Sequence, residues 1–297
     1  MSNMFKANLN FQIYQTYYRV KSELQKKVPM RYVGHKQNLS RKLQIGITTY
    51  IDRYDEFFKQ LYGDVRSLFP EVDLRIAVNG FFDEEEQKGY LRRVEGELCS
   101  KSSNNVTFIL HDHPVGLTKL WNEILFQSDH EHTLILNDDL HIFPWFRKWL
   151  ERNEWDSEYV TLIEGTWSNF FISKKAIRKV GWFDEGYQGI GFEDMDYTAR
   201  SKMMGATITN IRCPFLMHRD HKPTRTSFDN NTSTVWGPKY SSINQQYFYS
   251  KWKKSSVNSG IYIKQIDSCV EWTGKKEKPT NPRDFSFING CFYPDRQ

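Results

Sequence analysis

The sequence of 297 residues lacks the cysteine pattern of a structural metal site or of a disulfide-stabilised domain. Its cysteines are widely spaced and form no C-x-x-C pair. Isolated thiols of this kind are typical of buried side chains in a reducing compartment. The four cysteines are Cys99, Cys213, Cys269 and Cys291.

Long apolar runs are also missing. No stretch approaches the roughly eighteen apolar residues of a membrane-spanning helix. The first thirty residues lack the apolar region and the small-residue cleavage site of a signal peptide. We therefore expect no transmembrane helix and a cytoplasmic location.

Acidic residues are nearly absent from residues 1–42, which contain nine lysines and arginines but only one acid, Glu23. The other 255 residues carry a small excess of acids, so the net charge of +5 comes from this basic arm. Apolar residues at helical spacing over residues 8–28 predict an amphipathic helix that ends near Pro29. This helix either packs on the main domain or lies on an anionic membrane surface at its inner face.

From residue 43 onward, apolar strand-like segments alternate with helix-like segments. Continuous apolar strands between helices predict an α/β fold with a largely parallel sheet covered on both faces. The expected strands cover 43–50, 73–80, 105–113, 132–140 and 206–218, and the expected helices cover 55–69, 116–128, 193–205 and 242–254. We divide the chain into a basic helical arm (1–42), a catalytic domain (43–239) and a C-terminal extension packed on it (240–297).

The segment "LILNDDL" places two carboxylates, Asp138 and Asp139, where a buried strand ends. Ligands bind beyond the carboxyl ends of strands in open parallel sheets, and hard divalent ions are held by carboxylates together with substrate phosphates. If the strand breaks into a turn there, Asn137 and Asp139 face the same way and Asp138 faces the opposite side. The acids either hold a metal that grips a diphosphate, or solvate the strand end and cap the next turn.

A second acidic group follows Gly189 and Gly191 in "GYQGIGFEDMDY". Its acids, Glu193 and Asp194, either stabilise the first turn of a helix or supply a general base. Further on, "PFLMHRDH" ends an expected strand of the same sheet with His218 and His221. Each histidine is either an ordinary surface or core residue, or a metal ligand beside the acids.

Taken in this order, the motifs resemble the GT-A glycosyltransferases, and in particular the large inverting family 2. That family has an apolar strand ending in acids, then a "GxFDE…ED.D…R….G" block and a late histidine. The corresponding segments here are "LILNDDL", "GWFDEGYQGIGFEDMDYTARSKMMG" and the strand ending at His218, and the resemblance covers roughly residues 43–221.

The resemblance implies a GT-A (Rossmann-like) fold and a role for each motif residue. It makes Asp139 and His218, with His221 as the fallback, ligands of Mn²⁺ or Mg²⁺. It makes Asp194 the catalytic base and Glu193 a contact to the acceptor. It places Asp138 near the ribose or donor sugar. The nucleotide pocket would be lined by Thr48, Thr49, Tyr50 and Asn79.

The implied reaction is a single displacement in which Asp194 takes a proton from an acceptor hydroxyl and the anomeric carbon inverts. The partners would be a UDP-linked sugar donor and a saccharide or glycolipid acceptor in surface polysaccharide or lipopolysaccharide assembly, with no nucleic acid. One alternative is a nucleotidyltransferase on a similar sheet. The other is a non-enzymatic protein that binds nucleic acid or an anionic surface through residues 1–42.

Overall fold

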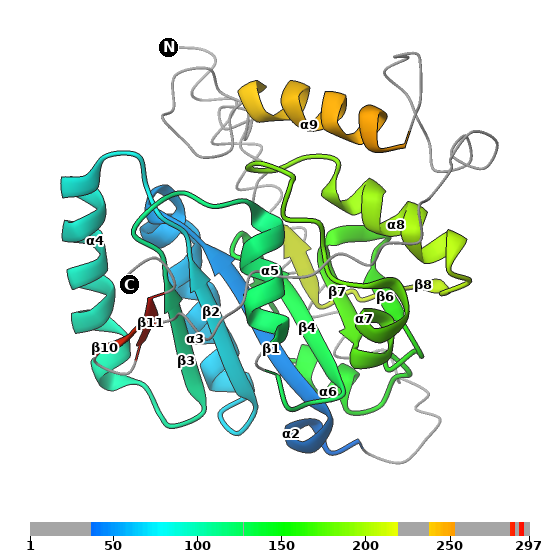
Figure 1. The fold of residues 1–297 in the computed structure, drawn as a ribbon. Coiled ribbons are helices and arrows are strands. Elements are labelled where there is room, and N and C mark those ends of the chain that lie inside the picture. Colours follow the sequence, from blue (N-terminus) through cyan, green and yellow to red (C-terminus); the bar gives the residue numbers. More distant parts are fainter. Residues whose placement is uncertain (1–36, 127, 219–237, 253–285, 289–290, 294–297) are drawn as a thin grey trace, which may run out of the picture.

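The computed structural model describes residues 37–126, 128–218, 238–252, 286–288 and 291–293. Its centre is a nine-stranded sheet with helices on both faces (Figure 1). In spatial order the strands are β10 (Ser286–Ile288), β11 (Cys291–Tyr293), β3 (Val106–Leu110), β2 (Asp73–Val78), β1 (Leu43–Thr49), β4 (His132–Asn137), β7 (Thr166–Ser173), β6 (Val160–Ile163) and β8 (Ile208–Ile211).

The central part of this sheet is parallel. The strands β11, β3, β2, β1 and β4 run parallel to one another, whereas β10 is antiparallel to β11 and β7 is antiparallel to both β4 and β6. The reversal follows from a two-residue hairpin, in which Glu164 and Gly165 both have positive φ and so form the turn that joins two antiparallel strands. The predicted α/β fold with a mostly parallel sheet flanked by helices is confirmed.

Alternation along the strands gives the sheet two apolar faces. Leu134 and Leu136 of β4 pack with α3, α4 and α6, while Ile135 between them packs with α5, α7 and α8. The α-helices are α2 (Leu39–Lys42), α3 (Lys59–Leu68), α4 (Glu84–Glu97), α5 (Leu117–Phe126), α6 (Phe146–Leu150), α7 (Lys174–Val180), α8 (Glu193–Met203) and α9 (Pro238–Lys251). Three short helical turns are η1 (Ile51–Arg53), η2 (Tyr54–Phe58) and η3 (Cys99–Lys101).

The strand that ends at His218 does not join the main sheet, which corrects the expectation from the sequence. After β8 the chain turns, and β9 (Leu216–His218) pairs instead with β5 (Leu140–Ile142) in a separate antiparallel sheet. The backbone N–H of Phe143 donates to the carbonyl of Phe215, which extends this pairing. Because Leu140 directly follows the acids at the end of β4 and is paired with His218, the histidine comes beside them.

The C-terminal part of the chain contributes to two regions of the fold. The strand β11 adds to the edge of the sheet next to β3, and α9 lies at the end of the sheet where β1 and β4 finish (Figure 1). The predicted amphipathic helix over 8–28, and His221, lie outside the described residues. In the part of the chain that is described, no helix is long and apolar enough to cross a membrane.

Candidate functional site

The carboxyl ends of β1, β2 and β4 meet at one edge of the sheet. Thr48 lies opposite Asn137 in the pairing of β1 with β4, and the N–H of Asn79 donates to the carbonyl of Thr49 at 2.7 Å. Parallel strands end together in this way because their registers are fixed by the hydrogen-bonded ladder. The predicted donor-side residues and the acidic turn after β4 therefore share one edge, the position where open α/β sheets bind ligands.

The turn after β4 holds two buried carboxylates that share one guanidinium. Asp138 is 3% exposed and Asp139 is 8% exposed. Arg53 from η1 reaches both: its Nε lies 2.6 Å from Oδ1 of Asp138, and a terminal nitrogen lies 2.8 Å from Oδ2 of Asp139. The guanidinium also lies over the ring of Phe57, at 4.7 Å from the ring centre. Burial of two adjacent carboxylates is tolerated here because a fixed cation compensates them.

Arg53 contacts only one oxygen of Asp138 and one of Asp139, so the second oxygen of each carboxylate can bind another partner. Oδ2 of Asp138 and Oδ1 of Asp139 are buried and have no well-formed hydrogen bond from the described residues, although Thr49 and His218 lie close enough to lower the pKa of Asp138 and of Asp139. Nδ1 of His218 lies 3.5 Å from Oδ1 of Asp139. A carboxylate oxygen of Asp139 beside the imidazole of His218 supplies two donors of the kinds that Mn²⁺ and Mg²⁺ accept in proteins, so this pair fits part of the expected metal site.

The protein alone supplies only part of a coordination shell. Among the residues that the structure describes, no three histidine, cysteine or acidic side chains are arranged to hold a metal ion. A cation bound at Asp139 and His218 would need further oxygen ligands, such as those of a diphosphate.

The two carboxylates of the turn differ in their electrostatics. Burial raises the pKa of Asp138 above its ordinary value, and the charge of Arg53 offsets only part of that rise. Burial also acts on Asp139, but its contacts with His218 and Arg53 outweigh burial and hold its pKa below the ordinary value. Asp139 is therefore the more firmly ionised of the two and the better ligand for a cation.

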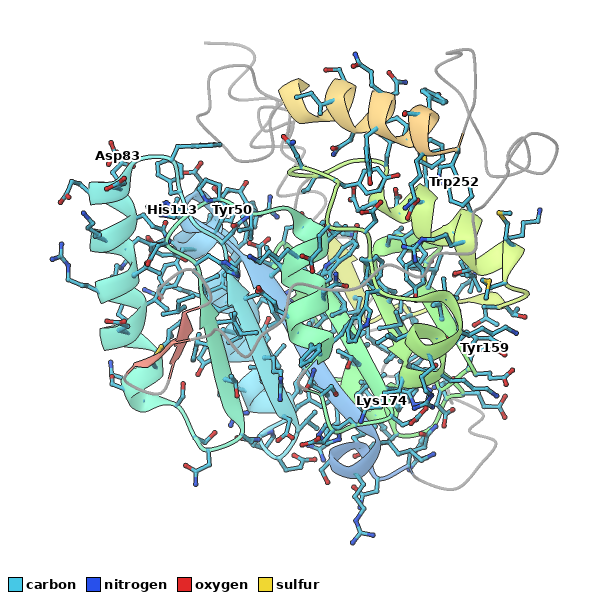
Figure 2. The ribbon with its side chains drawn as sticks, in the orientation of Figure 1. Tyr50, Asp83, His113, Tyr159, Lys174 and Trp252 are labelled. Atoms are coloured by element: carbon cyan, nitrogen blue, oxygen red, sulfur yellow. The ribbon has the colours of Figure 1, made fainter. Side chains whose placement is uncertain are left out.

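Side chains at the end of β1 and β2 form the neighbouring surface. The buried hydroxyl of Thr49 lies near the carboxylate of Asp138 and lowers its pKa. The ring of Tyr50 lies 5.9 Å from the guanidinium carbon of Arg53, at the end of the sheet shown in Figure 2. The side chain of Asn79 instead binds backbone, accepting from the N–H groups of Gly80 and Val115 and donating to the carbonyl of Val115. Asn79 thus shapes the loop before α5.

The second acidic group begins α8. Gly189, Gly191 and Phe192 all have positive φ, which turns the chain sharply into the helix. Glu193 accepts a hydrogen bond from the N–H of Gly191, and Oδ1 of Asp194 accepts one from the N–H of Met195 at 2.7 Å. Glu193 is buried, whereas Asp194 is partly exposed.

Both acids at the start of α8 have raised pKa values. Burial is the main cause for each, and the adjacent charge of Asp194 raises the pKa of Glu193 further. A carboxylate with a raised pKa accepts a proton more readily than an exposed one. The pair therefore has the electrostatics of a proton acceptor, with Asp194 as the accessible member.

Hydrogen bonds connect the acid pair with the edge of the sheet. Asn79 at the end of β2 binds Val115, and two residues later the N–H of Leu117 donates to the carbonyl of Gly189 at 3.0 Å. The loop that carries Glu193 is thus attached to the first turn of α5.

The contact of Arg53 with the acidic turn and the structural role of Asp196 were not predicted from the sequence. Arg53 was passed over because it lies 85 positions before its partner Asp138, and its signal is only that of a basic residue after a strand end. Asp196, the third acid of the "EDMD" segment, is completely buried and pairs with Arg200 one turn along α8. It also accepts a hydrogen bond from Trp252 at the end of α9, which Figure 2 shows beside α8. Asp196 is therefore a structural residue.

Neither a protein-family model nor a curated protein matches the sequence. Several solved structures are similar to it. One is S. aureus TarS in complex with UDP-GlcNAc, with 15% identity over 57% of this chain and a TM-score of 0.41. The match covers 56% of that TarS chain, so the present chain spans little more than half its length.

Two other similar structures come from different organisms. A mannosyltransferase from Pyrobaculum calidifontis, in complex with GDP-Man and Mn²⁺, has 9% identity over 74% of this chain and 68% of its own, with a TM-score of 0.46. A mutant of Drosophila β-1,4-galactosyltransferase 7, in complex with manganese, UDP-Gal and xylobiose, has 12% identity over 85% of this chain and 92% of its own, with a TM-score of 0.38.

Proposed function

We propose that this chain is a metal-dependent inverting glycosyltransferase that moves a sugar from a UDP-linked donor to a hydroxyl of a saccharide or glycolipid acceptor. The observation that carries the proposal is the acidic turn after β4. It keeps one buried oxygen of Asp138 and one of Asp139 without a well-formed hydrogen bond from the described residues, beside His218. Buried, unsatisfied carboxylate oxygens at a strand end are costly unless a ligand completes them.

In the proposed site Asp139 and His218 hold Mn²⁺ or Mg²⁺. When bound there, the metal supplies Lewis-acid stabilisation of the charge on the departing diphosphate. Asp138 faces the donor, and Thr48, Thr49 and Tyr50 form the nucleotide side of the pocket, while Asn79 holds the adjoining loop in place. The register that aligns β1 with β4 supports this assignment, because Thr48 lies opposite Asn137.

Proton transfer is assigned to the acids at the start of α8. Asp194 takes the proton of the acceptor hydroxyl, whose oxygen attacks the anomeric carbon from the side opposite the diphosphate and inverts it. Glu193 stays protonated more readily because it is the more buried of the two, and it contacts the acceptor. The raised pKa of Asp194 supports its role, since a general base works best when its pKa approaches the working pH.

We place the reaction in surface polysaccharide or lipopolysaccharide assembly, on the cytoplasmic face of the membrane. The nine basic residues of the arm 1–42 support contact with an anionic surface. The catalytic domain extends over 43–239, and α9 crosses its boundary with the C-terminal extension 240–297.

A panel of nucleotide sugars tests the function, with Mn²⁺ or Mg²⁺ and with EDTA, scored by release of the nucleotide. In the presence of the active donor and acceptor, Asp194→Asn should lower kcat by about a hundredfold or more, because a positioned base contributes 10²–10⁴-fold. UDP binding should remain, and the surface variant Asp156→Asn should behave as wild type. Full transfer activity in Asp194→Asn would contradict the assignment of Asp194 as the base. Turnover that EDTA does not affect would contradict the role of a metal.

A further inference from the structure

The C-terminal helix α9 contacts the segment that leads into the acid pair at three separate points. We call its contacting residues the α9 clasp: Asn244, Tyr247, Lys251 and Trp252. The clasp touches residues 184, 188 and 196, which lie before, within and after the sharp turn into α8. In Figure 1, α9 crosses above α8 at the end of the sheet where the acidic turn lies.

Lys251 joins the two ends of that segment. Its ammonium lies 2.6 Å from Oδ2 of Asp184 and 3.0 Å from Oδ1 of Asp196, and its own side chain is only 14% exposed. Asp184 also accepts from the hydroxyl of Tyr247 at 2.9 Å, and Trp252 Nε1 donates to Oδ1 of Asp196 at 3.0 Å. One ammonium thus compensates two carboxylates that flank Glu193 and Asp194 in the chain.

The middle of the segment is fixed through its backbone. The side chain of Asn244 accepts from the N–H of Gln188 at 2.9 Å and donates to the carbonyl of the same residue at 2.6 Å. A Cβ at Gly186 would lie 2.5 Å from the hydroxyl of Tyr247, so a larger residue there would push the side chain of Tyr247 away from Asp184. Around this contact the clasp buries Tyr187, Phe248 and Trp252 in one apolar cluster.

The segment needs such support because its conformation is unfavourable. Phe192 has φ of 71°, a value that costs free energy for a residue with a side chain. Only contacts from the surrounding structure hold a residue there. The hydrogen bond from Leu117 to Gly189 supplies one such contact from α5. Asn122 of α5 holds Phe183 and Glu185, and the clasp supplies further contacts.

We infer that Lys251 is a positioning residue that fixes the acid pair by tying Asp184 to Asp196. The inference rests on the proposed function of Asp194 as the base. The contacts of Lys251 with Asp184 and Asp196 act on the acid pair through the backbone between these two aspartates. This makes the C-terminal helix part of the acceptor half of the site, while donor binding depends on the edge formed by β1 and β4.

The test compares Lys251→Met with Lys251→Arg, and uses Lys88→Met on the exposed face of α4 as the matched control. With the donor and acceptor found in the nucleotide-sugar panel, Lys251→Met should lower kcat by about ten- to a hundredfold, since small displacements of a catalytic group cost rate of this order. The KM for the donor and the dissociation constant for UDP should stay unchanged. Lys251→Arg, which keeps the charge, should restore most of kcat.

Amide hydrogen exchange supplies a readout that does not depend on turnover. In Lys251→Met the amides of residues 186–195 should exchange faster, while those of the strands β1 and β4 keep their protection. Trp252→Phe removes only the indole donor to Asp196, and it should produce a smaller effect in the same amides. If Lys251→Met does not fold, amide exchange in Trp252→Phe still tests whether the clasp holds residues 186–195.

The outcomes separate this inference from the proposed function. Unchanged kcat and unchanged exchange over 186–195 in a folded Lys251→Met would overturn the inference, even if Asp194→Asn is inactive. A kcat loss that Lys251→Arg does not restore would also overturn it, since the charge would then not matter. If Asp194→Asn transfers normally, the proposed base is wrong, and faster exchange in Lys251→Met would then show a structural clasp without a catalytic role.

Discussion

The acidic turn at 138–139 and the acid pair at 193–194 both place adjacent carboxylates at the same edge of the molecule, but they are stabilised in opposite ways. The turn is compensated by the guanidinium of Arg53, which contacts both acids, and the imidazole of His218 lies near Asp139. Glu193 and Asp194 instead accept hydrogen bonds from the backbone N–H groups of Gly191 and Met195. The contacts with His218 and Arg53 hold the pKa of Asp139 low, whereas burial raises the pKa values of both acids of the pair despite their backbone hydrogen bonds.

This difference explains how one sequence uses carboxylates for two kinds of chemistry. A carboxylate that stays ionised suits a cation, whereas one that holds its proton more tightly suits proton transfer. The identity of the side chains does not decide between these roles, because each group contains an aspartate followed or preceded by another acid. The neighbours decide, and they come from distant parts of the chain.

The largest expected effect comes from removing the ionised member of the turn. Asp139→Asn keeps the size of the side chain but removes its charge, so it should lower kcat/KM by about a hundred- to a thousandfold through loss of the metal contact. It should also abolish the gain in UDP affinity that Mn²⁺ produces, measured by calorimetry with and without the metal. The control is Asp156→Asn, whose carboxylate pairs with Lys42 before β1. Retained Mn²⁺-dependent UDP binding in Asp139→Asn would contradict the assignment.

Removing the cation of the turn should come next in size. Arg53→Met leaves two buried carboxylates without their guanidinium, and breaking a buried ion pair from one side costs about 3–5 kcal/mol. Urea unfolding at pH 7 should therefore show a loss of about 3 kcal/mol in the absence of metal. Mn²⁺ binds the folded state only, so millimolar Mn²⁺ should recover part of that loss and should stabilise the variant more than wild type.

A matched control for Arg53→Met is Arg93→Met, because Arg93 forms its ion pairs with Asp55 and Glu97 at the surface. Surface pairs contribute about 0–1 kcal/mol, so this variant should lose little stability and gain nothing from Mn²⁺. If Arg53→Met and Arg93→Met lose the same stability and Mn²⁺ stabilises neither of them, the guanidinium of Arg53 does not compensate the two carboxylates of the turn.

The pH dependence of sugar transfer tests the role of the acid pair at residues 193–194. Asp194 must be ionised to act as a base, and its pKa is raised by burial. The rate kcat should therefore fall by about tenfold per pH unit below a midpoint that lies above the ordinary aspartate value of about 3.9. Rates measured from pH 4 to 8 locate that midpoint. A midpoint at or below the ordinary value would place the titrating base elsewhere.

Much of the fold could be predicted from the sequence, because its signals are local. Apolar runs such as 43–50 and 132–140 gave β1 and β4 and put Asp138 and Asp139 at a strand end. The start of α8 at Glu193 and its end near Gly205 follow from neighbouring residues as well. Strand ends and helix starts depend on a few adjacent side chains, so a single sequence is enough to find them.

The parts that could not be predicted depend on contacts between distant segments. β9 leaves the main sheet because it pairs with β5, and nothing in "PFLMH" specifies that partner. Arg53 meets Asp138 across 85 positions, and Lys251 meets Asp184 across 67. The electrostatic difference between the two acidic groups arises from such contacts, so the sequence alone left the roles of both groups open.

The smallest expected effect concerns stability at the acid pair. Burial and the charge of Asp194 raise the pKa of Glu193 in the folded state above its unfolded value, so the folded state holds this proton more tightly. Stability from this group is therefore present below the unfolded pKa of about 4.3 and declines as pH rises toward the folded pKa. Glu193→Gln mimics the protonated side chain and can still accept from Gly191. It should leave the free energy of unfolding unchanged at pH 4 and increase it by about 1 kcal/mol at pH 8, measured by urea unfolding at both values. A variant that is less stable than wild type at pH 8 would show that the ionised form of Glu193 is stabilised in the fold, and the contrast with the acidic turn would then disappear.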